Sequence, residues 1–169
     1  MATNVQVKQD WDNDGFLRIS GDETLKHYSE LKERQTRIPV KDYGIFFAFS
    51  DKQFEEGYQD LVQRGLIKDG DKVCRFPGGA FGLKDGMKRW VEEASAIDEQ
   101  ISRECDPYEV YLYEYNNYEC CIDWDGDERA VEAVLSLFGL ERTKEALRGR
   151  RMRKRGEIDA IYANMNKSN

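Results

Sequence analysis

The sequence is poor in the residues from which most catalytic and metal sites are built. It has one histidine, His27, in 169 residues, and its four cysteines include no C-x-x-C pair. Zinc needs ligands grouped at short spacings, so we predict no zinc site. Cys–His catalysis would have to use His27 as its base, yet this residue lies beside the apolar stripe of a predicted helix, which favours a structural role. We therefore predict no catalytic residue, no metal and no cofactor.

Long apolar segments and targeting signals are also missing. No apolar run is long enough to cross a bilayer, and the start MATNVQVKQDWDND lacks the basic flank and apolar core of a secretory signal. We therefore expect a cytoplasmic protein that does not contact a membrane. In that compartment Cys74, Cys105, Cys120 and Cys121 are expected to be reduced rather than joined in disulfides.

Charge is distributed unevenly along this acidic chain. The formal net charge is −7, yet residues 141–169 carry nine Lys or Arg against four acids, so this tail is at +5 and residues 1–140 are at −12. An acidic body repels polyanions, so a nucleic acid would have to bind at the tail. We predict contact with nucleic acid or an acidic partner at six residues: Arg148, Arg150, Arg151, Arg153, Lys154 and Arg155.

The order of helical and extended patterns predicts an α+β fold. We expect a small three-stranded mixed sheet flanked by amphipathic helices, followed by a helical basic tail. The length suits one domain with a real hydrophobic core. We divide the chain into a flexible N-terminal arm (1–21), a single globular domain (22–140) and the tail (141–169).

Hydrophobic periodicity locates the expected elements. Aromatic and β-branched runs predict three strands, the first of them buried on both faces, at residues 43–50, 72–76 and 109–122. Apolar residues at spacings of three and four predict helices in several segments. These are residues 22–35, the segment that follows a capping box at Ser50 and Gln53, the segment from Lys84 to Cys105, the segment that ends at Gly139, and two parts of the tail.

The stretch YEYNNYECC, residues 113–121, is the most polar part of a predicted strand. Neighbouring residues of a strand point to opposite faces, so Cys120 and Cys121 diverge and cannot chelate one ion. Tyr115, Asn117 and Glu119 then share a face at the strand end and could hydrogen-bond a ligand or a partner. Capping of nearby backbone is the simpler interpretation of such residues at a strand end.

The loop RFPGGAFGLKDG, residues 75–86, is a second candidate for a ligand site. Its glycines fit neither the P-loop pattern, which needs Gly-Lys-Ser/Thr, nor the dinucleotide fingerprint. Turns around Pro77 explain them, although an anion can also bind where a flexible loop precedes a helix. We assign Gly78 and Gly79 to such a site.

Two acidic loops leave the binding of a divalent cation open. Asp10–Gly15 resembles the first half of a calcium loop, but Gly21 stands where a bidentate glutamate belongs. Asp123–Glu128 is also rich in carboxylates. A turn in which Asp125 or Asp127 caps the following helix explains this second loop more simply.

Three motifs resemble an uncharacterised family of small proteins from bacterial genomes, prophages and other mobile elements. They are Tyr43–Gly57, Gly78–Gly86 and Val110–Glu119, and the resemblance spans about residues 43–138. In the third motif the family tends to have a histidine where Tyr118 stands, so a group suited to acid–base or metal chemistry is absent here. The resemblance implies a genomic setting, and the family has no assigned activity that it could imply.

Two classes of function follow from these observations. We expect a non-catalytic accessory binding protein of a phage or mobile element that docks on a host or element-encoded macromolecule. A protein partner is expected, nucleic acid is a possible partner through the tail, and the acidic surface could imitate nucleic acid to inhibit host defence. The alternative is a small-ligand-binding domain or enzyme that uses the loop Gly78–Gly86 with Tyr115, Asn117 and Glu119. The oligomeric state stays open.

Overall fold

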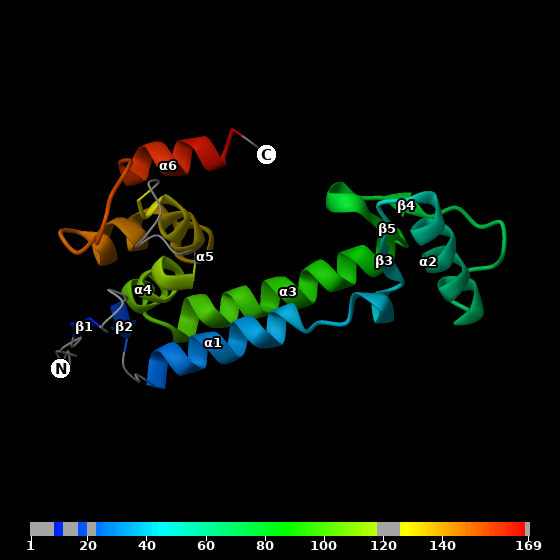
Figure 1. Ribbon diagram of the computed structural model, residues 1–169, viewed down its shortest axis with the longest axis horizontal. Coiled ribbons are helices and arrows are strands. Elements are labelled where there is room, and N and C mark those ends of the chain that lie inside the picture. Colours follow the sequence, from blue (N-terminus) through cyan, green and yellow to red (C-terminus); the bar gives the residue numbers. More distant parts are fainter. Residues whose placement is uncertain (1–8, 12–16, 20–22, 118–125, 168–169) are drawn as a thin grey trace. The chain divides into compact units, whose positions relative to one another are not determined.

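The computed structural model describes residues 9–11, 17–19, 23–117 and 126–167, and Figure 1 labels its elements. The chain divides into two compact units. Unit 1 comprises Met1–Lys32 with Asp98–Asn169, and unit 2 comprises Glu33–Ile97. Helices α1 (Glu23–Thr36) and α3 (Lys84–Glu104) contribute residues to both units. The division into an arm, a domain and a tail stays a prediction.

Unit 1 is built mainly from helices. Strands β1 and β2 pair antiparallel, with Gln9 opposite Ile19, in the segment expected to be an arm. Helices α4 and α6 both pack on α5. Besides its parts of α1 and α3, the unit contains β1 (Gln9–Trp11), β2 (Leu17–Ile19), α4 (Pro107–Asn117), α5 (Glu128–Leu147) and α6 (Ile158–Met165).

The apolar side predicted for α5 lies in the core of unit 1. Its buried residues include Val131, Val134, Leu135 and Phe138, which confirms the prediction from their spacing. Gly139 has a φ of 74°, so helical geometry breaks there as predicted, but α5 resumes and continues to Leu147. The hydroxyl of Thr143 donates to the carbonyl of Gly139 at 2.7 Å and satisfies one acceptor at this break.

The segment predicted as the third strand forms a helix. Residues 107–117 are helical, so the prediction of a strand over 109–122 is wrong for its described part, and Cys120 and Cys121 lie outside the described residues. Asp106 starts α4, because its Oδ1 accepts the backbone N–H groups of Tyr108 at 2.9 Å and Glu109 at 3.1 Å. Pro107 fits the first helical position, where no donor is needed. The cap overrides the strand preference of tyrosine and valine.

Unit 2 contains the three-stranded sheet. The strand order is β3 (Ile45–Phe47), β5 (Ala80–Gly82) and β4 (Cys74–Arg75). The α+β class with a three-stranded sheet is confirmed. Both pairings are antiparallel, so the prediction of a mixed sheet is wrong, and β5 takes the place of the expected third strand. A Cβ at Gly82 would lie 2.2 Å from the carbonyl oxygen of Gly44, so glycine permits the close backbone approach that β5 needs.

An aromatic cluster joins the sheet to helix α2 (Asp51–Gln63). The Oγ of Ser50 accepts the N–H of Gln53 at 3.3 Å, which confirms the predicted cap of this helix. The buried ring of Phe46 lies 5.7 Å from that of Phe54 and 5.8 Å from that of Phe81, measured between centroids. Two short 3-10 helices, η1 (Val40–Tyr43) and η2 (Pro77–Gly79), flank the sheet strands along the chain.

Strand β3 is an outer strand and is only partly buried. Ile45 and Phe46 are buried, whereas Phe47 is 50% exposed and Phe49, two residues further, is 79% exposed. Neighbouring residues of a strand point to opposite faces, so both faces are covered at Ile45 and Phe46, as predicted, and the prediction is wrong at Phe47. The outer position of β3 also leaves one of its backbone edges without a sheet neighbour.

Candidate functional site

Arg151 is a cation of the basic tail whose side chain is buried in unit 1. Its guanidinium group binds Asp127 twice, from Nη2 to Oδ1 at 2.5 Å and from Nε to Oδ2 at 2.9 Å. The side chain of Arg151 is 7% exposed and that of Asp127 is fully buried. Arg151 Nη1 also donates to the carbonyl of Gly156 at 2.6 Å. One planar guanidinium therefore ties the tail to the start of α5.

Tyr111 of α4 completes this buried network. Its hydroxyl donates to Oδ2 of Asp127 at 2.7 Å and accepts the backbone N–H of Met152 at 2.8 Å. Burial, and then the hydrogen bond to Asp127, raise the pKa of Tyr111 well above its usual range, so the phenol keeps its proton. The same hydroxyl group thus fixes both the carboxylate and the backbone of the tail.

Asp127 is not the side-chain cap that the sequence predicts. It occupies the N-cap position of α5, but its carboxylate makes no cap hydrogen bond because Arg151 and Tyr111 hold both of its oxygens. Asp125, the other predicted cap, lies outside the described residues, as do most of the two acidic loops. Among the residues that the structure describes, no group of three or more His, Cys, Asp and Glu could hold a metal ion.

The other five predicted contact residues lie on the surface of the segment between α5 and α6, here called the basic loop (residues 148–157). All five are exposed: Arg148, Arg150, Arg153, Lys154 and Arg155. The guanidinium carbon of Arg150 lies 3.5 Å from the ring centroid of Tyr108, a cation–π contact. Within the described ranges, Arg148 and Lys154 make no ion pair. The basic loop therefore combines a buried anchor with exposed cations.

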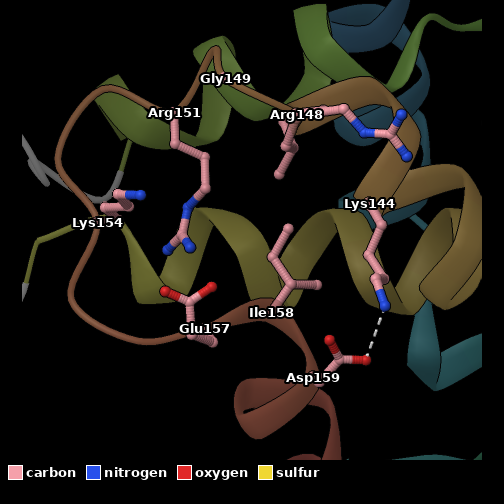
Figure 2. Close-up of a pocket in the computed structure, with 9 residues that line it drawn as sticks. Lys144, Arg148, Gly149, Arg151, Lys154, Glu157, Ile158 and Asp159 are labelled. Carbon is pink, nitrogen blue, oxygen red and sulfur yellow. Dashed lines mark hydrogen bonds and ion pairs between the residues drawn. The ribbon is translucent and has the colours of Figure 1, made fainter.

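A cavity of about 340 Å³ opens between the basic loop, the last turns of α5 and the first turn of α6 (Figure 2). Lys144 Nζ pairs with Oδ1 of Asp159 across it at 3.0 Å. In the view of Figure 2, Ile158 lies between Arg151 and Lys144. The lining residues carry four cations and two carboxylates and are Lys144, Leu147, Arg148, Gly149, Arg151, Lys154, Glu157, Ile158 and Asp159.

The predicted ligand cluster at residues 115–119 is not assembled as a strand-end site. Tyr115 is 3% exposed in the core of unit 1, so it cannot reach a ligand in solvent. Asn117 is exposed in the last turn of α4 and donates from Nδ2 to Oε2 of Glu114 at 3.2 Å. Glu119 lies outside the described residues. The helical geometry of α4 separates what an extended chain would place on one face.

Glu114 is a buried carboxylate that the sequence analysis does not assign to a site. It is fully buried and accepts a hydrogen bond from the hydroxyl of Tyr28, and Lys32 Nζ lies 3.6 Å from its Oε1. Together with Asn117 these groups compensate the desolvation of the charge. The network links α1 to α4 and has a structural role like that of Asp127.

The glycines at positions 78 and 79 form the turn between β4 and β5. Gly78 and Gly79 have φ values of 72° and 78°, the left-handed region that glycine adopts at little cost. A Cβ on Gly79 would lie 2.6 Å from the ring of Phe49. Both glycines therefore have a local structural reason, and they belong to unit 2, whereas Tyr115 and Asn117 belong to unit 1. Their assignment to a ligand site stays a prediction.

His27 of α1 pairs with a carboxylate of α3. Its Nε2 lies 2.9 Å from Oε2 of Glu104, and its side chain is 41% exposed. Hydrogen bonds from Gln100 and then His27 hold the pKa of Glu104 at about 2.

In the described part of the chain, no helix has both the length and the apolar character needed to cross a bilayer.

Comparison with known proteins places the chain in a family. A family of unknown function (DUF7659) matches residues 27–152, which is most of the chain. The chain belongs to this family. No curated protein and no solved structure matches it. The match extends beyond the segment 43–138 that the three motifs cover, because it also includes most of α1 and the start of the basic loop.

The DUF7659 region contains the buried anchor of the basic loop. Tyr111, Asp127 and Arg151 all lie within residues 27–152, whereas α6 follows that range. The cavity therefore combines a wall from the DUF7659 region with a wall from α6.

Proposed function

We propose that this chain is a nucleic-acid-binding accessory protein that contacts phosphates through the basic loop. The observation that carries the proposal is the difference in burial among six neighbouring cations. Arg151 is buried against Asp127, while the other five cations of the segment are exposed. A buried anchor limits the conformations of the loop, so less entropy is lost when its exposed side chains bind.

Nucleic acid suits this surface better than an acidic protein does. Phosphates follow one another closely along a strand, and the loop places five exposed cations within eight positions, residues 148–155. The stacked pair of Arg150 and Tyr108 adds planar groups of the kind that nucleic-acid sites use. The acidic remainder of the chain opposes the approach of a polyanion, so we expect modest affinity and a preference for low salt.

The preference for docking over catalysis cannot be based on a strand over residues 109–122, because the described part of that segment is helical. The proposal rests on the basic loop instead. A setting in a phage or mobile element, docking on a host macromolecule and inhibition of host defence stay predictions, and the genes next to this one would test that setting.

Fluorescence anisotropy with a short single-stranded oligonucleotide tests the proposal. Affinity should fall with salt, with a slope of log affinity against log salt of about −3 to −4 for five contacts at roughly −0.7 each. The triple variant Arg148→Gln, Arg150→Gln and Lys154→Gln should lose most of this binding. Its matched control replaces exposed cations of unit 2, Lys52→Gln with Lys88→Gln, and should bind like the wild type. Equal binding by both variants, or a flat salt response, contradicts the proposal.

A second candidate function is the docking of a protein at strand β3. Phe47 and Phe49 are exposed, and Phe47 lines a groove of about 540 Å³ whose charged residues are Lys41, Glu56 and Asp60. An outer strand can pair with an extended segment, and the net charge of −1 in the groove favours one with basic side chains. Replacement of Phe47 and Phe49 by serine should abolish capture of such a partner from the native host without lowering stability. Unchanged capture would contradict this second function.

A further inference from the structure

The cavity beside the basic loop has the charge balance of a site for an anion. Its lining carries Lys144, Arg148, Arg151 and Lys154 against Glu157 and Asp159, and with the Asp127 carboxylate that neutralises Arg151 the net charge is +1. Two of these cations have partners, since Arg151 binds Asp127 and Lys144 binds Asp159. Arg148 and Lys154 make no ion pair within the described ranges and can turn toward a bound anion.

The cavity also has an apolar part. Leu147 is buried and Ile158 is half-buried, and both line the cavity between the charged groups. A volume of about 340 Å³ falls at the lower end of the roughly 300–1,000 Å³ typical of small-molecule pockets. The site therefore has room for an organic group attached to the anion, and such a group could cover the exposed part of Ile158.

We infer that this cavity binds a phosphomonoester carried on a nucleoside, either a free mononucleotide or the phosphorylated end of a nucleic-acid strand. A phosphomonoester carries about −1.5 to −2 charges at neutral pH, which matches the two lining cations that make no ion pair, Arg148 and Lys154, whereas a phosphodiester within a strand carries one. Arg148 and Lys154 bind the phosphate. The apolar side chain of Ile158 contacts the base, and the carboxylate of Glu157 accepts hydrogen bonds from hydroxyl or amino groups.

This inference rests on the proposed function, because both use the anchored basic loop, and it adds a preference for a strand end. The loop would recognise strands by their internal phosphates, while the cavity would select the terminal phosphate. Loss of the cavity site would leave internal contacts through Arg150, Arg153 and Arg155, which do not line the cavity. The two statements can therefore fail separately.

The test compares four ligands on the full chain by isothermal titration calorimetry: AMP, adenosine, and one oligonucleotide with a 5′-phosphate or a 5′-hydroxyl end. AMP should bind and adenosine should not. Lys154→Gln should weaken AMP about tenfold, since a hydrogen bond to a charged group is worth roughly that factor. Lys154 is exposed, so this variant should fold, and Lys52→Gln is the matched control that should bind AMP like the wild type.

The outcomes separate the two claims. Tighter binding of the 5′-phosphorylated strand supports the inference with a strand end as ligand. Equal affinities for the two strands, together with binding of AMP, support it with a free mononucleotide as ligand. AMP binding without strand binding upholds the cavity and contradicts the proposed function. Equal binding of both strands without AMP binding overturns the inference and leaves the function intact. AMP binding that is unchanged in Lys154→Gln also overturns it, because the nucleotide is then held elsewhere.

Discussion

The interiors of the two units are held together by different kinds of contact. Unit 2 has a core of aromatic rings, in which Phe46, Phe54 and Phe81 contact one another with little polarity between them. Unit 1 buries two carboxylates, Glu114 and Asp127, each held by hydrogen bonds from other elements. Apolar cores gain stability from buried area, whereas buried ion pairs roughly repay their desolvation and gain mainly in geometric definition.

The difference bears on function. The Asp127 network positions the basic loop, which carries the proposed binding residues, and the aromatic core of unit 2 positions none of them. Polar contacts are directional, so they can fix a loop that has little apolar surface of its own. The variants below should affect the two cores in different ways.

The largest effect is expected from breaking the buried pair at one end. Arg151→Ala leaves the carboxylate of Asp127 buried without its cation and should lower the free energy of unfolding by about 3–5 kcal/mol. Urea denaturation measures this loss. The double variant Arg151→Met with Asp127→Leu should recover much of it, because it buries no charge. A loss under 1 kcal/mol in the single variant would contradict a structural role for Arg151.

The corresponding test in unit 2 adds volume instead of removing charge. Gly57 lies within α2, and a Cβ there would lie 2.2 Å from Cδ2 of Phe46. Alanine favours helix over glycine by about 1 kcal/mol, but overpacking costs about 1–3 kcal/mol, so Gly57→Ala should be destabilising by up to about 2 kcal/mol. Gln59→Ala, in the same helix, is the control and should change stability little. A stabilised Gly57→Ala would show that the aromatic core yields easily.

A smaller effect is expected at the second buried carboxylate. Glu114→Gln keeps the shape of the side chain and removes the charge that faces Lys32 and the Tyr28 hydroxyl. Because hydrogen bonds to charged groups are worth more than neutral ones, we expect a loss of about 1–2 kcal/mol, below that of Arg151→Ala. The binding of oligonucleotides should not change, since Glu114 does not contact the basic loop in the hydrogen bonds described. Impaired binding by this variant would couple the two networks.

The smallest effect concerns two thiols. Cys74 of unit 2 is exposed, and Cys105 of unit 1 is buried. Burial, with lesser contributions from Glu104 and Glu109, raises the pKa of Cys105 to about 11. The contribution of the protonated Cys105 thiol to stability is therefore complete below the ordinary thiol pKa and is lost as the pH rises through about 11. Alkylation mapped by mass spectrometry at pH 8 should label Cys74 quickly and Cys105 only in denaturant. Equal labelling would refute the burial of Cys105.

The helices of this chain are predictable from the sequence wherever an apolar stripe and a cap agree. The cap at Ser50 and the buried side of α5 both follow from local patterns. Helix α4 does not, because its Tyr and Val residues suggest a strand. Asp106 and Pro107 carried the missed signal, since an acidic cap followed by proline is a helix start.

The functional site was predictable in its location and not in its organisation. The run of cations marks the tail, but no local pattern distinguishes Arg151 from Arg150 or Arg153. The partner of Arg151, Asp127, lies 24 positions away, and their pairing depends on how α4, α5 and the loop pack. The sheet topology was not predictable for a similar reason. Strand β5 is a glycine-rich segment that is extended because it pairs with two neighbouring strands.

The anchoring of the basic loop is tested most directly by hydrogen exchange at the amide of Met152, followed by NMR. That N–H donates to the hydroxyl of Tyr111, so it should be protected in the wild type, and Tyr111→Phe should remove most of this protection while the amides of α2 keep theirs. Exchange of the wild-type Met152 amide at the rate of an unstructured chain would contradict the account, because the exposed cations would then lie on a loop without an anchor.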